Sequence, residues 1–163
     1  MLAACTMKRG PSLPPPDVVP SVDLTRYAGT WYEIASYPNR FQKGCSGTSA
    51  TYTLMPGGWI EVLNRCTRDG KNDSVKGRAK VADAMTNAKL KVTFFWPISG
   101  AYWIIELGAE YEYAVVSNPD RSYLWVLSRT PRMDKGIYVG IVERLRNSGF
   151  DIGKLARTVQ TEN

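Results

Sequence analysis

The chain contains no histidine among its 163 residues, and this absence excludes several kinds of site. Ser-His-Asp and Cys-His nucleophilic sites use an imidazole as their general base, and many zinc and haem sites use one as a ligand. The sequence also lacks a run of about 18 consecutive apolar residues, the length that a membrane-spanning helix needs. We therefore expect no metal, no cofactor and no enzymatic activity.

The composition is typical of one compact domain. The length is close to that of a typical domain, about 150 residues. The chain is 44% hydrophobic and 22% charged. Its 21 Lys and Arg residues exceed its 15 Asp and Glu residues, which gives a net charge of +6. A basic balance favours anionic partners, among them nucleic acid, phospholipid surfaces and acidic ligands, without choosing between them.

The first 22 residues are predicted to precede the folded domain, which we place at residues 23–163. Leu2-Ala3-Ala4-Cys5 resembles the lipobox of bacterial lipoproteins, although a complete signal also has an apolar region of about 7 to 15 residues. We expect a truncated signal in which Cys5 is the lipidation site, and a chance cysteine in a leader is the alternative. Residues 10–16 are rich in proline and predict an extended tether.

From residue 30 onward, short runs of β-branched and aromatic residues alternate with turn signals. Short connections such as 56–58 and 118–121 favour antiparallel neighbours. The pattern predicts an all-β fold, an eight-stranded up-and-down antiparallel barrel, with a helix at 131–147 packed outside and a last short strand at 155–160. The eight strands are expected at residues 30–37, 47–55, 59–66, 75–83, 88–95, 102–107, 111–117 and 122–129.

Successive side chains of a strand point to opposite faces, and the alternation of apolar and polar residues predicts which of them face the inside of the barrel. In the strand at 88–95, for example, Leu90 faces in and Lys91 faces out. In the strand at 102–107 we place Trp103 and Ile105 inside, because Glu106 is better solvated. Small inward residues would leave space for one small ligand, and a barrel packed solid is the alternative. These small residues are Ala35, Ala50, Gly77 and Ala79.

Two motifs at the ends of the strand pattern resemble the lipocalin family: Gly29-Thr30-Trp31-Tyr32-Glu33-Ile34-Ala35 and Leu127-Ser128-Arg129. The strings at 37–41, 50–52 and 123–131 are similar to the bacterial outer-membrane lipoprotein branch of that family. The resemblance covers about residues 23–160. It implies extracytoplasmic binding and carriage of lipids, with the protein anchored by its lipid in the bacterial outer membrane and facing the periplasm.

Three residues are expected to close one end of the barrel: Gly29, Trp31 and Arg129. Trp31 and Arg129 lie at the same end and both face in by parity, so the guanidinium can stack on the indole. The family often carries Thr-Asp-Tyr nearby, where this chain has Leu107-Gly108-Ala109-Glu110-Tyr111. The role of this end is structural, not catalytic.

Cys45 and Cys66 lie near the open rim in this topology. The hairpin around residues 56–58 sets Cys66 roughly opposite position 48, a few residues from Cys45. A disulfide is within reach if the local backbone brings the two Cα atoms within about 7 Å. An even number of remaining cysteines, once Cys5 is set aside, suits an oxidising compartment.

We expect the pocket to bind a fatty acid or lysophospholipid, with a basic rim that includes Arg40 beside an apolar interior. The alternatives are an isoprenoid or pigment carrier, or a lipocalin enzyme that uses Glu33 as acid or base. We expect no nucleic-acid partner and a monomer or weak homodimer. The residues expected to contact the ligand are Tyr52, Val62, Val75, Ala79, Val92, Phe94, Trp103, Val116, Tyr123 and Trp125, with Arg40 at the rim.

Overall fold

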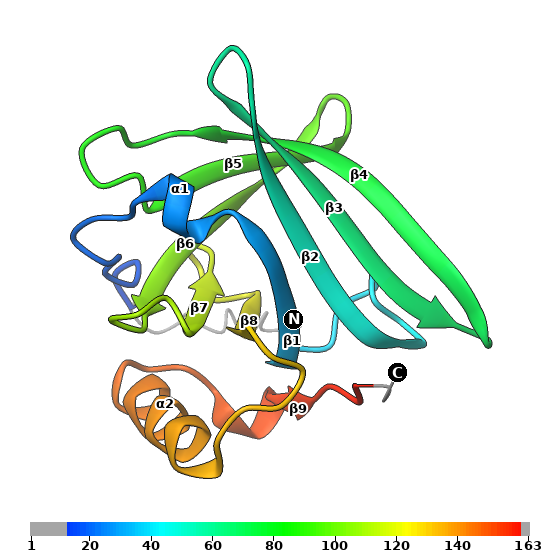
Figure 1. Cartoon of the computed structure of the whole chain (residues 1–163). Coiled ribbons are helices and arrows are strands. Elements are labelled where there is room, and N and C mark those ends of the chain that lie inside the picture. Colours follow the sequence, from blue (N-terminus) through cyan, green and yellow to red (C-terminus); the bar gives the residue numbers. More distant parts are fainter. Residues whose placement is uncertain (1–12, 161–163) are drawn as a thin grey trace, which may run out of the picture.

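The computed structural model describes residues 13–160, and the expected lipidation site Cys5 lies outside them. The eight barrel strands are β1 (Gly29–Ser36), β2 (Cys45–Met55), β3 (Trp59–Arg68), β4 (Lys71–Val81), β5 (Lys89–Phe95), β6 (Ile98–Leu107), β7 (Tyr113–Ser117) and β8 (Leu124–Ser128). Each strand pairs antiparallel with the next, and β1 pairs with both β8 and β2, which closes the barrel (Figure 1). The predicted eight-stranded up-and-down barrel is confirmed.

Two hairpins at the open end are longer than predicted. β4 begins at Lys71, four residues before the expected start, because Asp69 and Gly70 form a tight turn with positive φ values of 52° and 73°. Residues 71–74 are polar and show no hydrophobic alternation, yet all four pair with β3. β6 likewise begins at Ile98, so the β5–β6 connection is a tight turn at the same end of the barrel.

The helix α2 (Lys135–Asn147) lies outside the barrel, below it in the view of Figure 1. Asp134 caps its N-terminus by accepting a hydrogen bond from the Ile137 amide, so the helix begins at residue 135 rather than at 131. Ile141 and Leu145 are buried on the helix face that packs against the outer side of β7 and β8. The predicted outer helix is thus confirmed.

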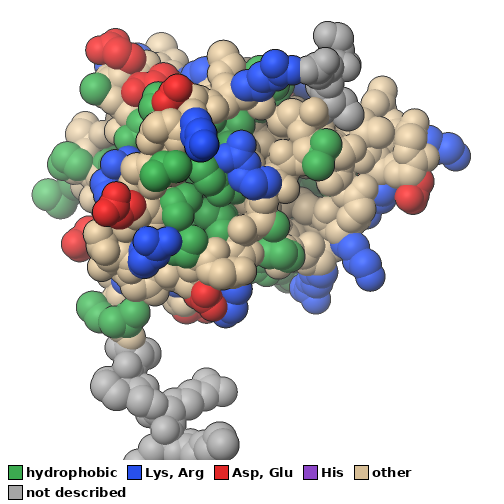
Figure 2. All heavy atoms as spheres, turned by 90° about the horizontal axis from the view of Figure 1, so that it is seen from below, with side chains coloured by type: hydrophobic (Ala, Val, Ile, Leu, Met, Phe, Trp, Pro, Cys, Tyr) green, Lys and Arg blue, Asp and Glu red, His purple; other side chains and the backbone are tan. Residues whose placement is uncertain are grey.

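Seen from below, the face that carries α2 and the C-terminal segment has hydrophobic side chains near its middle and Lys and Arg side chains around them (Figure 2). Exposed Ile137 and Val139 belong to the solvent side of α2. No helix among residues 13–160 is long and apolar enough to cross a membrane.

The strand pairing of the described residues shifts in register at four places, and the shifts in β6 and β1 contradict inward assignments made from alternation. The register of β6 shifts between Ile104 and Glu106, so Ile105 and Glu106 both face out. Ile104 therefore faces in, and Trp103 faces out, where the Lys89 ammonium lies 4.3 Å from the centre of its ring. The inward placement of Trp103 and Ile105 is wrong, because counting back from Glu106 skips the bulge.

A second bulge lies in β1, where the register with β8 shifts between Glu33 and Ala35. Ala35 consequently packs in the outer cluster between the barrel and α2, and its inward placement is also wrong. Glu33 keeps its inward direction, opposite Leu127 of the barrel interior.

Part of the expected tether packs against the barrel. Pro16 and Val22 are buried, and the Val19 amide donates to the Ile104 carbonyl at 3.0 Å. The short helix α1 (Leu24–Tyr27), which the sequence analysis did not predict, follows with Asp23 as its N-cap. The structured domain therefore begins several residues before the predicted boundary at residue 23.

The C-terminal segment fills a gap between β1 and β2. These strands pair directly only from Gly29↔Tyr52 to Tyr32↔Ser49. Beyond that point, β9 (Ala156–Arg157), which follows a short 3-10 helix (Ile152–Lys154), pairs with β1 on one side. On the other side the Gly47 amide of β2 donates to the Val159 carbonyl at 2.7 Å. Residues 156–160 therefore close the gap between β1 and β2 at the open end. The predicted last strand thus bridges these two barrel strands.

Candidate functional site

The closed end of the barrel is held by Trp31 and Arg129. The guanidinium carbon lies 3.8 Å from the centre of the indole ring. The same guanidinium donates to the carbonyls of Arg26, Tyr27, Ala28 and Thr30, and to that of Tyr111. Burial lowers the pKa of the Arg129 side chain, the expected direction for a desolvated cation.

Gly29 makes room for that guanidinium. Its φ of 98° lies in the region that favours glycine, and a Cβ at this position would lie 3.2 Å from Arg129 Nη1. The departure from the family pattern at residues 107–111 leaves this end intact, because the Tyr111 hydroxyl accepts a hydrogen bond from the Asp23 amide.

Three tyrosines fill the half of the interior next to the closed end, which we call the lower half. The Tyr27 and Tyr102 hydroxyls are 2.7 Å apart, and the Tyr52 hydroxyl donates to Tyr102 at 3.0 Å. Burial raises the pKa of Tyr52 to about 12 and raises the pKa values of Tyr27 and Tyr102 well above their usual range. Since these hydroxyls satisfy one another away from water, this half of the barrel is a packed core.

The half of the interior next to the mouth, which we call the upper half, is more open. Along β3, β4 and β5 the inward side chains change from buried in the middle of the barrel to half-buried near the mouth: Ile60 and Val62 precede Asn64, Ala79 follows Gly77 and Val75, and Leu90 precedes Val92 and Phe94. At the mouth these half-buried side chains contact solvent that enters from the open end. The interior is therefore most closely packed around the tyrosine cluster and more exposed toward the mouth.

Gly77 does not add empty space. A Cβ at this position would lie 2.6 Å from Cδ1 of Phe94, so the glycine accommodates the Phe94 ring on the neighbouring strand. The expectation that small inward residues leave room is thus wrong for Gly77, and the ring of Phe94 forms one wall of the upper half.

An opposite wall comes from β8. The rings of Tyr123 and Trp125 stack with their centres 5.5 Å apart and an angle of 3° between their planes. The Trp125 Nε1–H donates to Gln42 Oε1 at 3.2 Å. Gln42 belongs to the β1–β2 loop, and this hydrogen bond brings that loop to the barrel mouth.

Glu33 lies directly behind Gln42 and is almost completely buried. Its carboxylate accepts hydrogen bonds from the Ser36 hydroxyl, the Gln42 amide and the Thr158 hydroxyl. These three neutral donors tie β1, the β1–β2 loop and the C-terminal segment together. The carboxylate is thereby engaged in holding the mouth, which is a structural role.

The rim contains the disulfide between Cys45 and Cys66, whose Cα atoms are 5.5 Å apart, and the predicted pairing is confirmed. A hollow of about 550 Å³ lies beside it, between the β1–β2 loop and the C-terminal segment. Arg40 borders this hollow and is exposed, with its guanidinium carbon 4.9 Å from the centre of the Phe41 ring.

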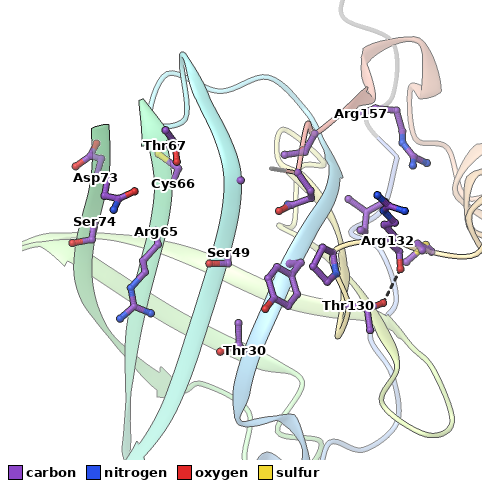
Figure 3. Close-up of a pocket in the computed structure, with 18 residues that line it drawn as sticks. Thr30, Ser49, Arg65, Cys66, Thr67, Asp73, Ser74, Thr130, Arg132 and Arg157 are labelled. Carbon is purple, nitrogen blue, oxygen red and sulfur yellow. Dashed lines mark hydrogen bonds between the residues drawn. The ribbon is translucent and has the colours of Figure 1, made fainter. Parts of the chain in front are cut away.

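A larger hollow of about 1480 Å³ lies on the outer face of β1 to β4, against the linker to α2 (Figure 3). Its wall is polar, with Arg65 on one side and Arg132 and Arg157 on the other. The sequence analysis missed it because outward polar residues carry no periodic signal that marks a groove.

The structure places the expected ligand contacts at different depths. Tyr52, Val62, Ala79, Val92 and Val116 belong to the buried interior cluster, while Phe94 and Trp125 pack against it and stay partly exposed. Val75 and Tyr123 are half-buried near the mouth, Arg40 is at the rim, and Trp103 is outside. Half-buried Asn64 of β3 lies at the same end, as does Gln42 through its hydrogen bond to Trp125.

The chain matches known proteins over most of its length. Residues 22–160 match the family described as lipocalin-like domain. Temperature-induced lipocalin-1 of Arabidopsis thaliana is 43% identical over 155 residues, which covers 90% of this chain and 83% of that protein. Outer membrane lipoprotein Blc of Escherichia coli is 40% identical over 139 residues, covering 84% and 78%. Apolipoprotein D of Mus musculus is 37% identical over 157 residues, covering 90% and 82%.

Solved structures agree on the fold. Insecticyanin from the tobacco hornworm Manduca sexta superimposes with a TM-score of 0.74 at 21% identity, covering 93% of this chain and 86% of that one. Lobster apocrustacyanin A1 gives 0.71 at 18% identity, covering 95% and 94%. The resemblance found in the sequence is confirmed, and the chain belongs to the lipocalin family.

Proposed function

We propose that this protein binds and carries a single-chain lipid, a fatty acid or a lysophospholipid, in the upper half of its barrel. The observation that carries the proposal is the change from buried to half-buried inward side chains toward the mouth. Val75, Val92 and Phe94 on one side and Trp125 on the other would contact the acyl chain. The tyrosine cluster below them would set how deep the chain can reach.

The expected affinity follows from the apolar surface of the chain. Each buried methylene contributes about 0.8 kcal/mol, so about ten of them contribute about 8 kcal/mol before the cost of ordering the ligand. Without that cost, about 8 kcal/mol would correspond to a dissociation constant near the micromolar range, and the ordering cost makes the observed binding weaker than this. The headgroup would stay at the mouth, within reach of Arg40 and Lys43 on the β1–β2 loop.

The cell envelope is the proposed location. Bacterial relatives at about 40% identity are named outer membrane lipoproteins, and the Cys45–Cys66 disulfide suits an oxidising compartment. Other relatives come from a plant, mammals and a virus, so the envelope assignment depends on lipidation at Cys5. The intact mass of the membrane-bound gene product tests it, and an unmodified Cys5 would rule out the lipid anchor.

Calorimetric titration with a fatty acid and with a lysophospholipid, each below its critical micelle concentration, tests the binding proposal. We expect one ligand per barrel, with affinity weakened at least tenfold in Trp125→Ala and unchanged in the outward control Lys91→Ala. No saturable binding, or equal effects of both substitutions, would overturn the proposal. An absorption band of the purified protein in the visible range would favour a pigment as ligand instead.

A further inference from the structure

The apex of the β5–β6 hairpin exposes three large apolar side chains. Phe95, Trp96 and Ile98 are 64%, 88% and 74% exposed to solvent. These three side chains do not pack in the barrel core, where Val92 and Phe94 of the same hairpin lie instead. Exposed apolar residues that gather at one point of a soluble domain indicate a contact surface.

The residues that flank this apex in the sequence carry no negative charge. From Val92 to Ile105 the chain has no charged residue at all. The β1–β2 loop belongs to the same end of the barrel, since both connections follow odd-numbered strands of an antiparallel meander. That loop exposes 57% of Phe41 and carries Arg40 and Lys43.

Acidic residues are few at this end of the barrel. Between Glu33 and Glu61 the sequence contains none. At the β3–β4 turn, Asp73 is paired with Arg68 at 3.3 Å, and Lys71 lies next to the exposed Asp69 and Gly70. In the β7–β8 loop, Asp120 accepts hydrogen bonds from Asn118 and Ser122 and is followed by Arg121. The mouth therefore combines exposed aromatic residues with a net basic rim.

This combination fits a lipid bilayer. Trp and Phe side chains favour the headgroup region of membranes, and each Lys or Arg near an anionic surface contributes about 1 kcal/mol. A second copy of the chain fits less well. Three side chains at an apex cover about 600 Å² at most, below the about 800 Å² that each partner buries in a stable protein interface.

We propose that the barrel mouth docks on an anionic phospholipid bilayer, with Phe95, Trp96 and Ile98 in the headgroup region and Arg40 and Lys43 against anionic headgroups. This contact is separate from any lipid at Cys5 and does not depend on a ligand in the barrel. It places the mouth at the membrane, where a single-chain lipid could enter or leave the interior without crossing water.

Vesicle flotation of the full chain, with Cys5 shown by intact mass to be unmodified, tests the proposal. One set of vesicles contains only phosphatidylcholine and the other contains about a third phosphatidylglycerol. The variant F95S/W96S/I98S removes the apex, R40Q/K43Q removes the basic loop, and M85S is the matched control. Met85 is 92% exposed but lies in the β4–β5 connection, at the opposite end of the barrel.

We expect the wild type to bind the anionic vesicles, with a blue shift of Trp96 fluorescence that disappears in the apex variant. Binding should fall at least tenfold in the apex variant, fall several-fold in R40Q/K43Q and at high salt, and stay unchanged in M85S. An equal loss in M85S, no loss in the apex variant, or no vesicle binding by the wild type would overturn the proposal.

Two further measurements separate this proposal from its alternatives. All three changed apex side chains are exposed, so the apex variant should unfold at the same temperature as the wild type and should still bind monomeric lysophospholipid. Loss of soluble-lipid binding would concern the barrel site, whereas loss of flotation alone concerns docking. A wild type that is dimeric and becomes monomeric on changing the apex, without vesicle binding, would assign the surface to a second copy.

Discussion

The guanidinium of Arg129 stacks on the indole of Trp31 and also donates hydrogen bonds to four carbonyls of residues 26–30. One side chain thus ties the end of the last barrel strand to the start of the first. The indole Nε1–H donates in turn to the Tyr27 carbonyl at 2.9 Å. Closure of this end therefore depends on the contacts of Arg129 as well as on direct strand pairing.

Arg129→Ala is expected to destabilise the fold by about 3 kcal/mol. The substitution removes the cation–π contact and leaves several carbonyls without donors at a buried end. Urea denaturation at neutral pH measures the change. Arg65→Ala, at an exposed position of β3, is the control and should stay within about 0.5 kcal/mol of the wild type. A similarly small change for Arg129→Ala would contradict a role in closure.

Stability should fall as the pH rises above about 10. The pKa of Tyr52 is raised from 10.0 to about 12, and those of Tyr27 and Tyr102 are raised in the same direction by burial. The folded state therefore holds these protons more tightly, and the unfolded state releases them from about pH 10 upward. The stabilisation is complete below that pH and is lost through pH 12.

Absorbance of tyrosinate, recorded during alkaline titration together with circular dichroism, checks this prediction. We expect three of the nine tyrosines to ionise only as the fold is lost. The triple variant Tyr27→Phe/Tyr52→Phe/Tyr102→Phe should lose these three late groups, whereas Tyr37 and Tyr113, whose pKa values are also raised by burial, remain. Ionisation of all nine near pH 10 in the folded protein would show that the tyrosine cluster is open to water.

Removal of the disulfide should cost about 3 kcal/mol. Cys45 and Cys66 are separated by 21 positions, and a cross-link over a loop of that size restricts the unfolded chain by about this amount. Denaturation of Cys45→Ser/Cys66→Ser, compared with the wild type under oxidising and reducing conditions, gives the value. Reduced wild type and the double variant should agree, and a large difference between them would point to an effect other than the cross-link.

Truncation after Leu155 should open the seam between β1 and β2. The Gly47 amide then loses its acceptor on Val159, and the buried Glu33 carboxylate loses the Thr158 hydroxyl. Hydrogen exchange should accelerate at Gly47 by at least tenfold. The amide of Thr51, in the part where β2 pairs directly with β1, is the internal control and should stay protected. Unchanged exchange at Gly47 would show that the seam is closed without the C-terminal segment.

Much of the fold could be predicted because alternation is regular in most strands. In the first part of β5, Lys89 and Lys91 alternate with Leu90 and Val92, and the inward side chains followed directly. The helix also followed from its period. Trp103 and Ala35 were misplaced because a β-bulge adds one residue to a strand and reverses every later assignment, and nothing in the local composition of β6 or β1 marks the extra residue.

Other features were missed because they depend on contacts between distant residues. Residues 71–74 read as a loop, yet β3 supplies their hydrogen bonds. The Glu33 carboxylate finds its donors on Gln42 and Thr158, 9 and 125 positions away. The packing of Phe94 on Gly77 turns an expected gap into a wall. In each case the residue type is visible in the sequence, but its partner is set by the closed barrel.

Methyl NMR spectra of the valine side chains, recorded while a lysophospholipid is added, test the central claim most directly. Val115 and Val116 are adjacent in β7 and face opposite sides, the first toward α2 and the second into the barrel. The account predicts shifts and contacts to the acyl chain at Val75, Val92 and Val116, with Val115 and Val126 unchanged. Shifts confined to Val115 and Val126, or no contact at any interior valine at saturating ligand, would contradict a lipid site inside the barrel.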